Sequence, residues 1–407
     1  MTNTTGALAE GKAGNLGKDE VCTIECMKIV ITDIRYKMAL APLWSLTQAG
    51  YSVICGESAQ IPEEECLGFY SKYCEERIRW PQREEISEAI VSSCPAGSVV
   101  LPVGRGTLRS FAQRPKVASR VQVLVSPVAV LDRADDKGEV QQLARSLGIP
   151  TPKTYYRQPE ESLSDLAQRL QYPVILKHRN GEALGLKSWQ RYRIGHDPEE
   201  FPALYESMEA VADRPVVQDY LIGRDVGVAM VMDAQSRPVD FFCYESLQEY
   251  PLAGGPTCLC QTMFDRQLVE YAAKLLSALQ FQGLAMLDFK ATKTGLFLLE
   301  VNPRLWGSAA LATAAGASLF ESWVQATMGQ AELLDVSTCQ PGYQLGVRMK
   351  FFPHCLLAGG KELGRGHGKA FFQDLGVSLH PGVPDGVRLC GDRGPGRRYL
   401  RNLLRRG

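Results

Sequence analysis

The sequence predicts a fold that is α/β at its start and α+β beyond it, with an N-terminal doubly wound parallel sheet. An apolar run at residues 28–33, apolar residues at helical spacing over 38–49 and a second apolar run at 51–55 predict a strand, a helix and a strand in close succession. That succession opens a parallel βαβ unit. Further along, apolar runs at 284–290 and 296–301 predict an antiparallel strand pair.

The first helix is delimited by residues at its two ends. Pro42 is tolerated only in the first turn of a helix, so we expect this helix to begin near residue 41. Gly50 follows the last apolar position and is a common residue at the end of a helix. Apolar runs at 98–101 and 121–125 are expected to continue the same parallel sheet.

The middle of the chain contains a second set of elements. A helix that ends at Gly148 is followed by Pro150 and Pro152, which fix an extended connection, and we place a subdomain boundary near them. Beyond this boundary the pattern predicts strands at 173–177, 216–221, 226–233 and 239–244 and helices at 268–279 and 311–328.

The composition argues against several classes of protein. The 407 residues include 45 Lys+Arg and 45 Asp+Glu, so the net charge is zero, whereas proteins that mainly bind nucleic acids or anionic membranes carry a basic excess. No apolar run approaches about 18 residues, so no membrane-spanning helix is expected. The 12 cysteines lack CxxC spacing and no secretory signal precedes them, which favours reduced thiols in a cytoplasmic protein over a zinc site.

Both ends of the chain differ from the rest. Residues 1–20 are rich in Gly, Ala and Thr and are expected to form a disordered tail. Within them, residues 6–12 have the spacing of a phosphate-binding loop, but Ala13 stands where Ser or Thr is needed, so we attribute the match to chance. Residues 393–406 carry six arginines, which we interpret as a solvated or partner-facing basic terminus.

The most informative segment joins Asp288 to residues 299–308. Strand alternation places Glu300 and Asn302 on one face, and pairing with the preceding strand lets Asp288 face them. Two carboxylates and an amide oxygen are hard ligands, suited to Mg²⁺ rather than to zinc. Arg304 shares that face and would stabilise the charge on a transferring phosphoryl group. A polar strand edge with a surface arginine is the alternative interpretation.

Other side chains have the chemistry to bind a nucleotide. Lys177 ends a strand beside a polar loop and could reach a phosphate, although a surface lysine is the plainer alternative. Gln218 and the strand end up to Leu221 could form hydrogen bonds with an adenine edge. Asp225 could accept both ribose hydroxyls, unless it is a turn aspartate. Lys137, at a helix start, could supply a second phosphate contact.

These features occur in an order that resembles the ATP-grasp superfamily of ligases. The resemblance spans residues 28–329. Its motifs lie at 67–74, 136–137, 148–154, 173–177, 217–223, 287–290 and 299–308. The motif at 299–308 is the most specific of these. The first βα turn lacks the glycine pattern of dinucleotide-binding folds, so a dinucleotide cofactor is not expected there. The resemblance implies an N-terminal doubly wound parallel-sheet domain followed by a two-lobed ATP-grasp fold.

The resemblance also implies where the domains begin and end. The implied units are a tail at 1–20, an N-terminal domain at 21–126, an ATP-grasp domain at 127–340 and a C-terminal extension at 341–407. The ATP-grasp domain divides into a small lobe at 127–214 and a large lobe at 215–340. The extension completes the large lobe and ends in the basic terminus.

Carried over residue by residue, the resemblance implies a role for each candidate. The implied ATP-binding residues are Lys137, Lys177, Gln218, Asp219, Tyr220, Leu221 and Asp225. The implied ligands of one or two Mg²⁺, or of Mn²⁺ in their place, are Asp288, Glu300 and Asn302. The implied catalytic residues are Lys177 and Arg304, and the loop at 178–187 would close over the phosphates. Asp219 and Asp225 stand where the family more usually has glutamate.

The resemblance implies an ATP-dependent carboxylate–amine ligase. A carboxylate attacks the γ-phosphate of ATP to give an acyl phosphate, and an amine or amino acid then displaces phosphate to form an amide. The expected cofactors are ATP and Mg²⁺. The expected partners are a small-molecule carboxylate and an amine, and neither a nucleic acid nor a membrane is expected. The chain could form a homodimer. A bicarbonate-phosphorylating enzyme and a non-catalytic ATP-binding protein are the alternatives.

The substrates are expected to contact a second loop. The residues that resemble a family loop near the acyl phosphate are Glu249, Gly254, Gly255 and Thr257. Cys258 and Cys260 follow this loop and are interpreted as ordinary strand residues, with a thiol-sensitive site as the alternative. Arg348 and Lys350 alternate on an expected strand, where they could hold a second carboxylate or lie on a solvated face.

Overall fold

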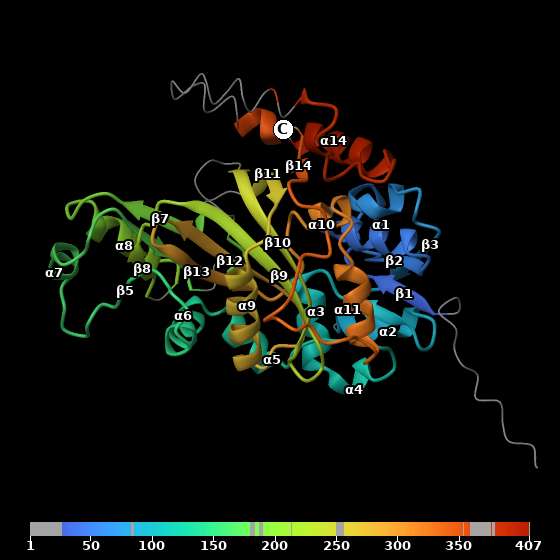
Figure 1. The fold of residues 1–407 in the computed structure, drawn as a ribbon, viewed down its shortest axis with the longest axis horizontal. Coiled ribbons are helices and arrows are strands. Elements are labelled where there is room, and N and C mark those ends of the chain that lie inside the picture. Colours follow the sequence, from blue (N-terminus) through green and yellow to red (C-terminus); the bar gives the residue numbers. More distant parts are fainter. Residues whose placement is uncertain are drawn as a thin grey trace, which may run out of the picture.

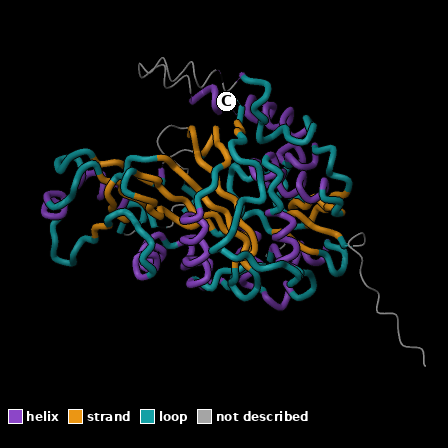
Figure 2. Tube along the Cα trace, viewed as in Figure 1, coloured by secondary structure: helices purple, strands orange, loops and turns teal. Residues whose placement is uncertain are grey.

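The computed structural model describes residues 27–82, 85–179, 184–186, 190–212, 214–249, 256–352, 354–358, 376 and 379–406. The expected tail at 1–20, the loop glycines Gly254 and Gly255, and half of the loop at 178–187 lie outside the described residues. Figure 2 shows strands running through the middle of the molecule with most of the helices around them.

A four-stranded parallel sheet, called sheet A, lies at the N-terminal end of the molecule (Figure 1). Its strands, in the order β3-β2-β1-β4, are β1 (Lys28–Ile31), β2 (Ser52–Ser58), β3 (Glu76–Trp80) and β4 (Val99–Leu101). Its helices are η2 (Lys37–Ala39), α1 (Leu40–Gln48), η3 (Glu63–Glu65), η4 (Leu67–Tyr70), α2 (Ile86–Ser93), α3 (Arg105–Gln113) and α4 (Pro115–Ala118). The predicted strand, helix and strand are confirmed, and α1 begins next to the expected residue 41.

Two features of sheet A differ from the expectation. Residues 121–125 form no strand, because only Gln122 pairs, in a parallel bridge with Val99, before the chain reaches the next helix at Pro127. Strand β3 was not predicted from the sequence. Its letters, ERIRW, are mostly charged, which an edge strand tolerates because one of its sides is open to solvent.

A second sheet, called sheet B, is small and antiparallel. It is preceded by α5 (Val128–Asp135) and α6 (Lys137–Ser146). Its strands, in the order β5-β8-β6-β7, are β5 (Thr154–Tyr155), β8 (Val216–Asp219), β6 (Val174–Lys177) and β7 (Tyr192–Gly195). Helices α7 (Leu163–Gln168) and α8 (Phe201–Glu209) supply the other half of a separate small core.

The largest sheet, called sheet C, has six antiparallel strands in the order β13-β12-β9-β10-β11-β14. They are β9 (Arg224–Met232), β10 (Pro238–Glu249), β11 (Thr257–Thr262), β12 (Gly283–Thr292), β13 (Gly295–Asn302) and β14 (Arg348–Lys350). The expected antiparallel pair is β12 with β13. The central strand β9 is buried over seven consecutive residues, since helices pack on the sheet and cover it.

The helices around sheet C join it to sheet A. They are α9 (Arg266–Ala278), α10 (Ala310–Ala314) and α11 (Leu319–Thr327). The single helix expected at 311–328 is therefore two helices, broken at Gly316, whose φ of +71° ends the first one. Helix α10 packs against α1, where the Thr313 hydroxyl donates to the Ala41 carbonyl at 3.1 Å. One hydrophobic core consequently runs through both sheets.

The basic C-terminus is a helix that packs on one side against the N-terminal part of the chain. Helix α14 (Gly394–Arg406) lies beside η4, at the N-terminal sheet (Figure 1). Arg398 donates from Nε to the Glu64 carbonyl at 2.6 Å, and Trp44 donates from Nε1 to the Asp392 carboxylate at 3.0 Å. The contacts hold one side of the basic terminus, while its Arg397, Arg401 and Arg405 stay exposed as expected of a solvated terminus. Within the described part of the chain, no helix is long and apolar enough to cross a membrane.

Candidate active site

The strands β12 and β13 bring Asp288, Glu300 and Asn302 together, as their spacing predicts. In the register of this pair Asp288 lies directly opposite Glu300, and Asn302 is two residues further along the same strand. The Asn302 amide donates from Nδ2 to Asp288 at 3.0 Å and to Glu300 at 3.4 Å. The two carboxylates and the amide therefore form one polar, half-buried cluster on this strand pair.

Helix α6 places a lysine on this cluster. The carboxylate of Asp136 caps the helix by accepting from the backbone N–H of Gly138 at 2.7 Å and of Glu139 at 3.0 Å. Lys137, the first helical residue, lies with its Nζ 2.5 Å from Glu300. The N-cap thus fixes the helix end from which Lys137 reaches the hairpin.

Opposite pKa shifts distinguish the two carboxylates. Burial raises the pKa of Asp288 well above its usual value, and the neighbouring charges of Glu300 and Asp225 raise it further. Burial alone would also raise the pKa of Glu300, but Lys137 and Lys177 outweigh burial and lower that pKa to about 2. The negative charge of the pair is therefore held at Glu300, and Asp288 sits where a further cation would stabilise its ionised form.

Lys177 brings sheet B to the same cluster. It is the last residue of β6. Burial lowers the pKa of its ammonium to about 8. The repulsion of Lys137 and Lys290 also lowers this pKa, whereas the attraction of Glu300 raises it. Two lysines from different elements thus act on the Glu300 carboxylate, and Lys290 lies close enough to repel Lys177, which is an environment suited to a polyanion.

Asp225 forms an ion pair with Lys290, a residue for which the sequence predicted no role. The register pairs Asp225 on β9 with Lys290 on β12, and Lys290 Nζ lies 2.5 Å from the Asp225 carboxylate. The alternation of Asp288 and Lys290 along one strand was the signal that both side chains face the same side of the sheet. The predicted ribose contact of Asp225 stays a prediction.

The segment predicted to contact adenine ends strand β8. Gln218 is buried, and its amide donates from Nε2 to the Thr154 hydroxyl at 3.1 Å. Asp219 accepts from the Tyr155 hydroxyl at 2.8 Å, and the Tyr220 N–H donates to the carbonyl before β6, that of Pro173, at 3.0 Å. Strand β8 ends at Asp219, so Tyr220 and Leu221 belong to the connection that leads from sheet B to sheet C.

Arg304 and the expected substrate loop lie on the margins of the cluster. Arg304 directly follows β13, and its guanidinium donates from Nη1 to the Leu305 carbonyl at 2.9 Å. Glu249 ends β10 opposite Thr257 on β11, and the Thr257 hydroxyl lies 2.9 Å from that of Ser246. The loop between these two strands lies outside the described residues.

Comparison with known proteins identifies the fold. Residues 254–350 match a family described as ATP-grasp in the biosynthetic pathway with Ter operon. A biotin carboxylase–β-γ-ATP complex from Campylobacter jejuni has 17% sequence identity and a TM-score of 0.60, over 79% of this chain and 74% of that chain. The biotin carboxylase domain of a Hydrogenobacter thermophilus 2-oxoglutarate carboxylase, solved with MgADP and bicarbonate, has 15% identity and a TM-score of 0.58, over 79% and 73%. Phosphoribosylglycinamide synthetase from Anaerococcus prevotii has 12% identity and a TM-score of 0.54, over 79% of each chain.

The chain has the ATP-grasp fold. The resemblance inferred from the ordered motifs is confirmed at the level of the fold, and the mixed α/β and α+β class is confirmed with it. The parallel sheet A and the antiparallel sheets B and C are the parts that the motifs implied.

The acidic pair fits the chemistry of Mg²⁺. Among the described residues, no group of three His, Cys, Asp or Glu side chains is placed to hold a metal. The donor set is therefore two carboxylates, Asp288 and Glu300, with the Asn302 amide beside them. Its Nδ2 now faces both carboxylates, and a half-turn of the amide would present the oxygen instead. Such a set of hard oxygen donors matches Mg²⁺.

A buried aromatic pair beside the cluster was not found from the sequence. Tyr244 on β10 pairs with Gly227 on β9, and Gly227 pairs with Asp288 on β12. A Cβ at position 227 would lie 2.8 Å from the Tyr244 hydroxyl oxygen, so only glycine lets this side chain lie across the strand. The Trp306 ring stacks on Tyr244, with 6.1 Å between centroids and 14° between planes. A glycine inside the apolar run at 226–233 was the available signal.

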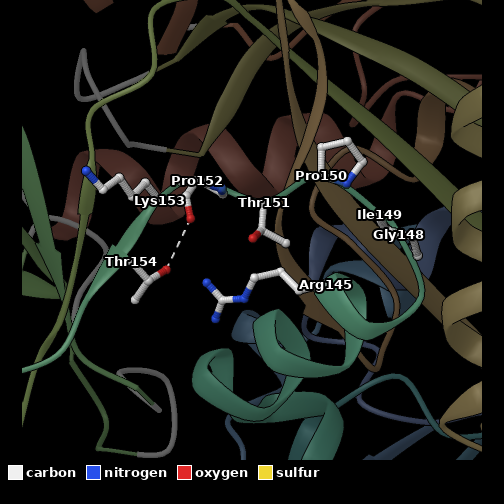
Figure 3. A pocket seen from close by; sticks show the side chains of 8 residues that line it. All are labelled: Arg145, Gly148, Ile149, Pro150, Thr151, Pro152, Lys153 and Thr154. Atoms are coloured by element: carbon white, nitrogen blue, oxygen red, sulfur yellow. Dashed lines mark hydrogen bonds between the residues drawn. The ribbon is translucent and has the colours of Figure 1, made fainter.

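A cavity of about 470 Å³ opens elsewhere, on the connection between α6 and β5. Figure 3 shows its lining, with the Thr154 hydroxyl donating to the Pro152 carbonyl at 3.1 Å and Arg145 rising from the end of α6. The residues that line it are Arg145, Gly148, Ile149, Pro150, Thr151, Pro152, Lys153 and Thr154. None of the predicted site residues is among them, so this cavity is distinct from the carboxylate cluster.

Proposed function

We propose that this protein is an ATP-dependent carboxylate–amine ligase that releases ADP and phosphate. The observation that carries the proposal is the meeting of α6, β6 and the β12–β13 hairpin at one point. There Lys137 is paired with Glu300, Lys177 lies in the field of the same carboxylate, and Asp288 and Asn302 are adjacent. A chain with the ATP-grasp fold and this cluster has both the cations and the acidic pair that phosphoryl transfer needs.

The phosphates of ATP would bind beside Lys137 and Lys177. Lys137 and Lys177 come from different elements and both stabilise the charge of Glu300, so a triphosphate would compete with that carboxylate for their ammonium groups. Asp288, Glu300 and Asn302 would hold Mg²⁺. When bound, the ion would offset the negative charge of the phosphates. Gln218 to Leu221 would lie along the adenine, and Asp225 beside the ribose.

The reaction would proceed in two displacements at this cluster. An oxygen of the substrate carboxylate attacks the γ-phosphorus, the bond to the β-γ bridging oxygen breaks, and ADP leaves with an acyl phosphate behind. The amine then attacks the acyl carbon, phosphate leaves, and the amine gives up a proton to solvent or phosphate. Lys177 and Arg304 would stabilise the charge that develops on the phosphoryl oxygens. Positioning and charge neutralisation are all that the protein must supply.

The test is ADP release from the whole chain with ATP, Mg²⁺ and a panel of acids and amines. We expect ADP to form only when an acid and an amine are both present, and mass spectrometry then to show the amide. Glu300→Gln should reduce kcat by about 100-fold or more, because it removes the charge that organises both lysines. The matched control Glu332→Gln changes an exposed glutamate and should be neutral.

Two outcomes would overturn the proposal. Release of AMP and pyrophosphate would show an adenylating ligase instead. ADP release that needs bicarbonate and no other acid would favour the bicarbonate-phosphorylating alternative. An unchanged rate in Glu300→Gln would refute the assignment of the cluster as the active site.

A further inference from the structure

The cavity at the end of α6 lies on the segment that leads from this helix into sheet B. Its lining is Arg145 together with residues 148–154, so one continuous segment, called the hinge segment, forms most of it (Figure 3). The volume of about 470 Å³ lies in the range of sites for small molecules. The proposed function gives this cavity no role.

The cavity is bordered by cations rather than by acids. Residues 140–159 include three cationic side chains and no acidic one. In the part of the chain that the structure describes, neither Arg145 nor Lys153 forms an ion pair. Arg145 donates from Nη2 to the Tyr156 hydroxyl at 3.3 Å, and Lys153 Nζ lies 4.8 Å from the centroid of the Tyr155 ring. Guanidinium and ammonium groups without a carboxylate partner are suited to an oxyanion.

Two threonine hydroxyl groups add hydrogen-bonding capacity to the same cavity. Figure 3 shows the guanidinium of Arg145 and the hydroxyl oxygens of Thr151 and Thr154 around one space. The Thr151 hydroxyl is buried and has no hydrogen-bond partner among the described residues, which costs free energy. Rotation of this side chain toward the cavity would let it donate to a ligand oxygen and would remove that cost.

The carbonyl groups at the end of α6, which would repel an anion, are paired. Gly148, with a φ of +72°, ends the helix, and the Ile149 N–H donates to the Ala144 carbonyl at 2.9 Å. Lys274 on α9 donates from Nζ to the Leu147 carbonyl at 2.5 Å. The negative end of the helix dipole is thus compensated by a further cation next to the lining of the cavity.

The hinge segment is hydrogen-bonded to the residues predicted to contact adenine. Thr154 lies opposite Gln218 in the register of β5 with β8, and its hydroxyl accepts from Gln218 Nε2 at 3.1 Å. The same hydroxyl donates to the Pro152 carbonyl at 3.1 Å. The Lys153 carbonyl accepts from the Asp219 N–H at 3.0 Å. The lining of the cavity therefore supplies acceptors for both Gln218 and Asp219.

The hinge segment is also fixed to strand β13. The Pro150 carbonyl accepts from the Leu298 N–H at 2.8 Å, two residues before Glu300 on that strand. A ligand that orders the hinge segment would therefore order contacts to both sides of the predicted nucleotide site. ATP would then bind with a smaller loss of conformational entropy.

We propose that this cavity is an effector site for a small anion, a molecule whose phosphate or carboxylate group pairs with Arg145, and that its occupation strengthens ATP binding. The anion site stands on the cavity itself, whereas its effect on ATP rests on the proposed function. Because coupling between two binding sites is reciprocal, ATP strengthens binding of the anion by the same factor.

The first test needs neither ATP nor turnover. The whole chain is treated with limiting p-hydroxyphenylglyoxal at fixed ionic strength, with inorganic phosphate, citrate, glycerol or no addition, and modification is read per arginine by peptide mass spectrometry. We expect phosphate or citrate to slow modification of Arg145 several-fold, and the exposed Arg120 to react equally in all four solutions. Protection by only one of the two anions assigns the site to phosphates or to carboxylates. Equal rates at Arg145 in every solution would overturn the proposal.

A variant distinguishes the cavity from loose association of an anion with a surface arginine. Thr151→Val keeps the shape of the side chain and removes its hydroxyl, so protection of Arg145 should weaken. Protection that is as strong in this variant as in wild type, and that extends to Arg120, would show unspecific association and would count against a built site.

The second test measures the coupling. The dissociation constant of β,γ-methylene-ATP with Mg²⁺ is determined with and without phosphate, or citrate if only citrate protects, in wild type and Arg145→Ala. Competition of the anion with the triphosphate affects both proteins equally, so the ratio between them isolates the cavity. We expect the anion to favour nucleotide binding about fivefold more in wild type than in Arg145→Ala. Arg120→Ala should behave as wild type. Amide hydrogen exchange of residues 148–154 should slow with the anion in wild type only.

The two tests separate failure of the effector site from failure of the function. Protection of Arg145 without any binding of the ATP analogue would retain the anion site and reject the proposed function. Binding of the analogue with an equal effect of the anion in wild type and Arg145→Ala would retain the nucleotide site and reject the effector role.

Discussion

At the scale of single residues, the anions of the cluster are held by cations that come from elsewhere in the chain. Glu300 on β13 pairs with Lys137 at the start of α6, and Asp225 on β9 pairs with Lys290 on β12. Each pair is close to neutral as it stands. A triphosphate would take over the lysines and leave the carboxylates to a metal ion, so one exchange of partners would couple binding of the nucleotide to binding of the metal.

The glycine at position 227 is required by the side chain across the strand. We expect Gly227→Ala to lower the free energy of unfolding by about 1–3 kcal/mol, because the new Cβ would overlap the Tyr244 ring at 2.5 Å beside Asp288. Urea denaturation measures the effect. The control Gly106→Ala adds a Cβ in a helix where nothing lies within 4 Å, so it should be neutral or stabilising. Equal effects of the two substitutions would contradict the packing argument.

At the scale of elements, sequence patterns located what depends on local periodicity. Alternation along 299–308 and pairing with the preceding strand were enough to place Glu300 opposite Asp288 and Asn302 on the same face, because a hairpin pairs neighbours in sequence. Strand β3 and the ion pair of Lys290 with Asp225 were not predicted. The first lacks an apolar run, and the second joins two strands whose adjacency depends on the order of sheet C. The division into domains and the roles of the site residues stay predictions.

The cap of helix α6 should matter for nucleotide binding as well as for stability. Asp136→Ala removes the acceptor of two backbone N–H groups, so we expect a loss of about 1 kcal/mol in the free energy of unfolding. It should also raise KM for ATP several-fold, because Lys137 projects from the frayed end. Ser162→Ala removes the cap of α7 in the small core and should cost similar stability without changing KM. The comparison uses urea denaturation and steady-state ADP release, and an identical KM in both variants would disprove the link.

At the scale of the whole molecule, the C-terminal part of the chain packs against the N-terminal part. The last strand of sheet C, β14, is followed by a segment that returns to sheet A, where α14 packs on η4. The buried side chain of Asp392 makes the connection by accepting hydrogen bonds from Trp44 in α1 and from the hydroxyl of Ser71. The C-terminal segment is thereby linked to α1, the helix that also packs against α10. These contacts stabilise the region where sheets A and C meet.

The buried hydrogen bonds of Asp392 should therefore contribute to the stability of the whole molecule. Asp392→Ala leaves the fully buried Trp44 N–H and the Ser71 hydroxyl without their acceptor, so we expect the free energy of unfolding to fall by about 2–4 kcal/mol. Asp132→Ala, which removes an exposed partner of Arg109, should cost at most about 1 kcal/mol. Urea denaturation followed by Trp fluorescence and by circular dichroism distinguishes two cases. Coincident, shifted transitions would mean that the C-terminal segment folds with sheet A, whereas an early separate transition, or a loss no larger than that of the control, would mean that α14 frays on its own.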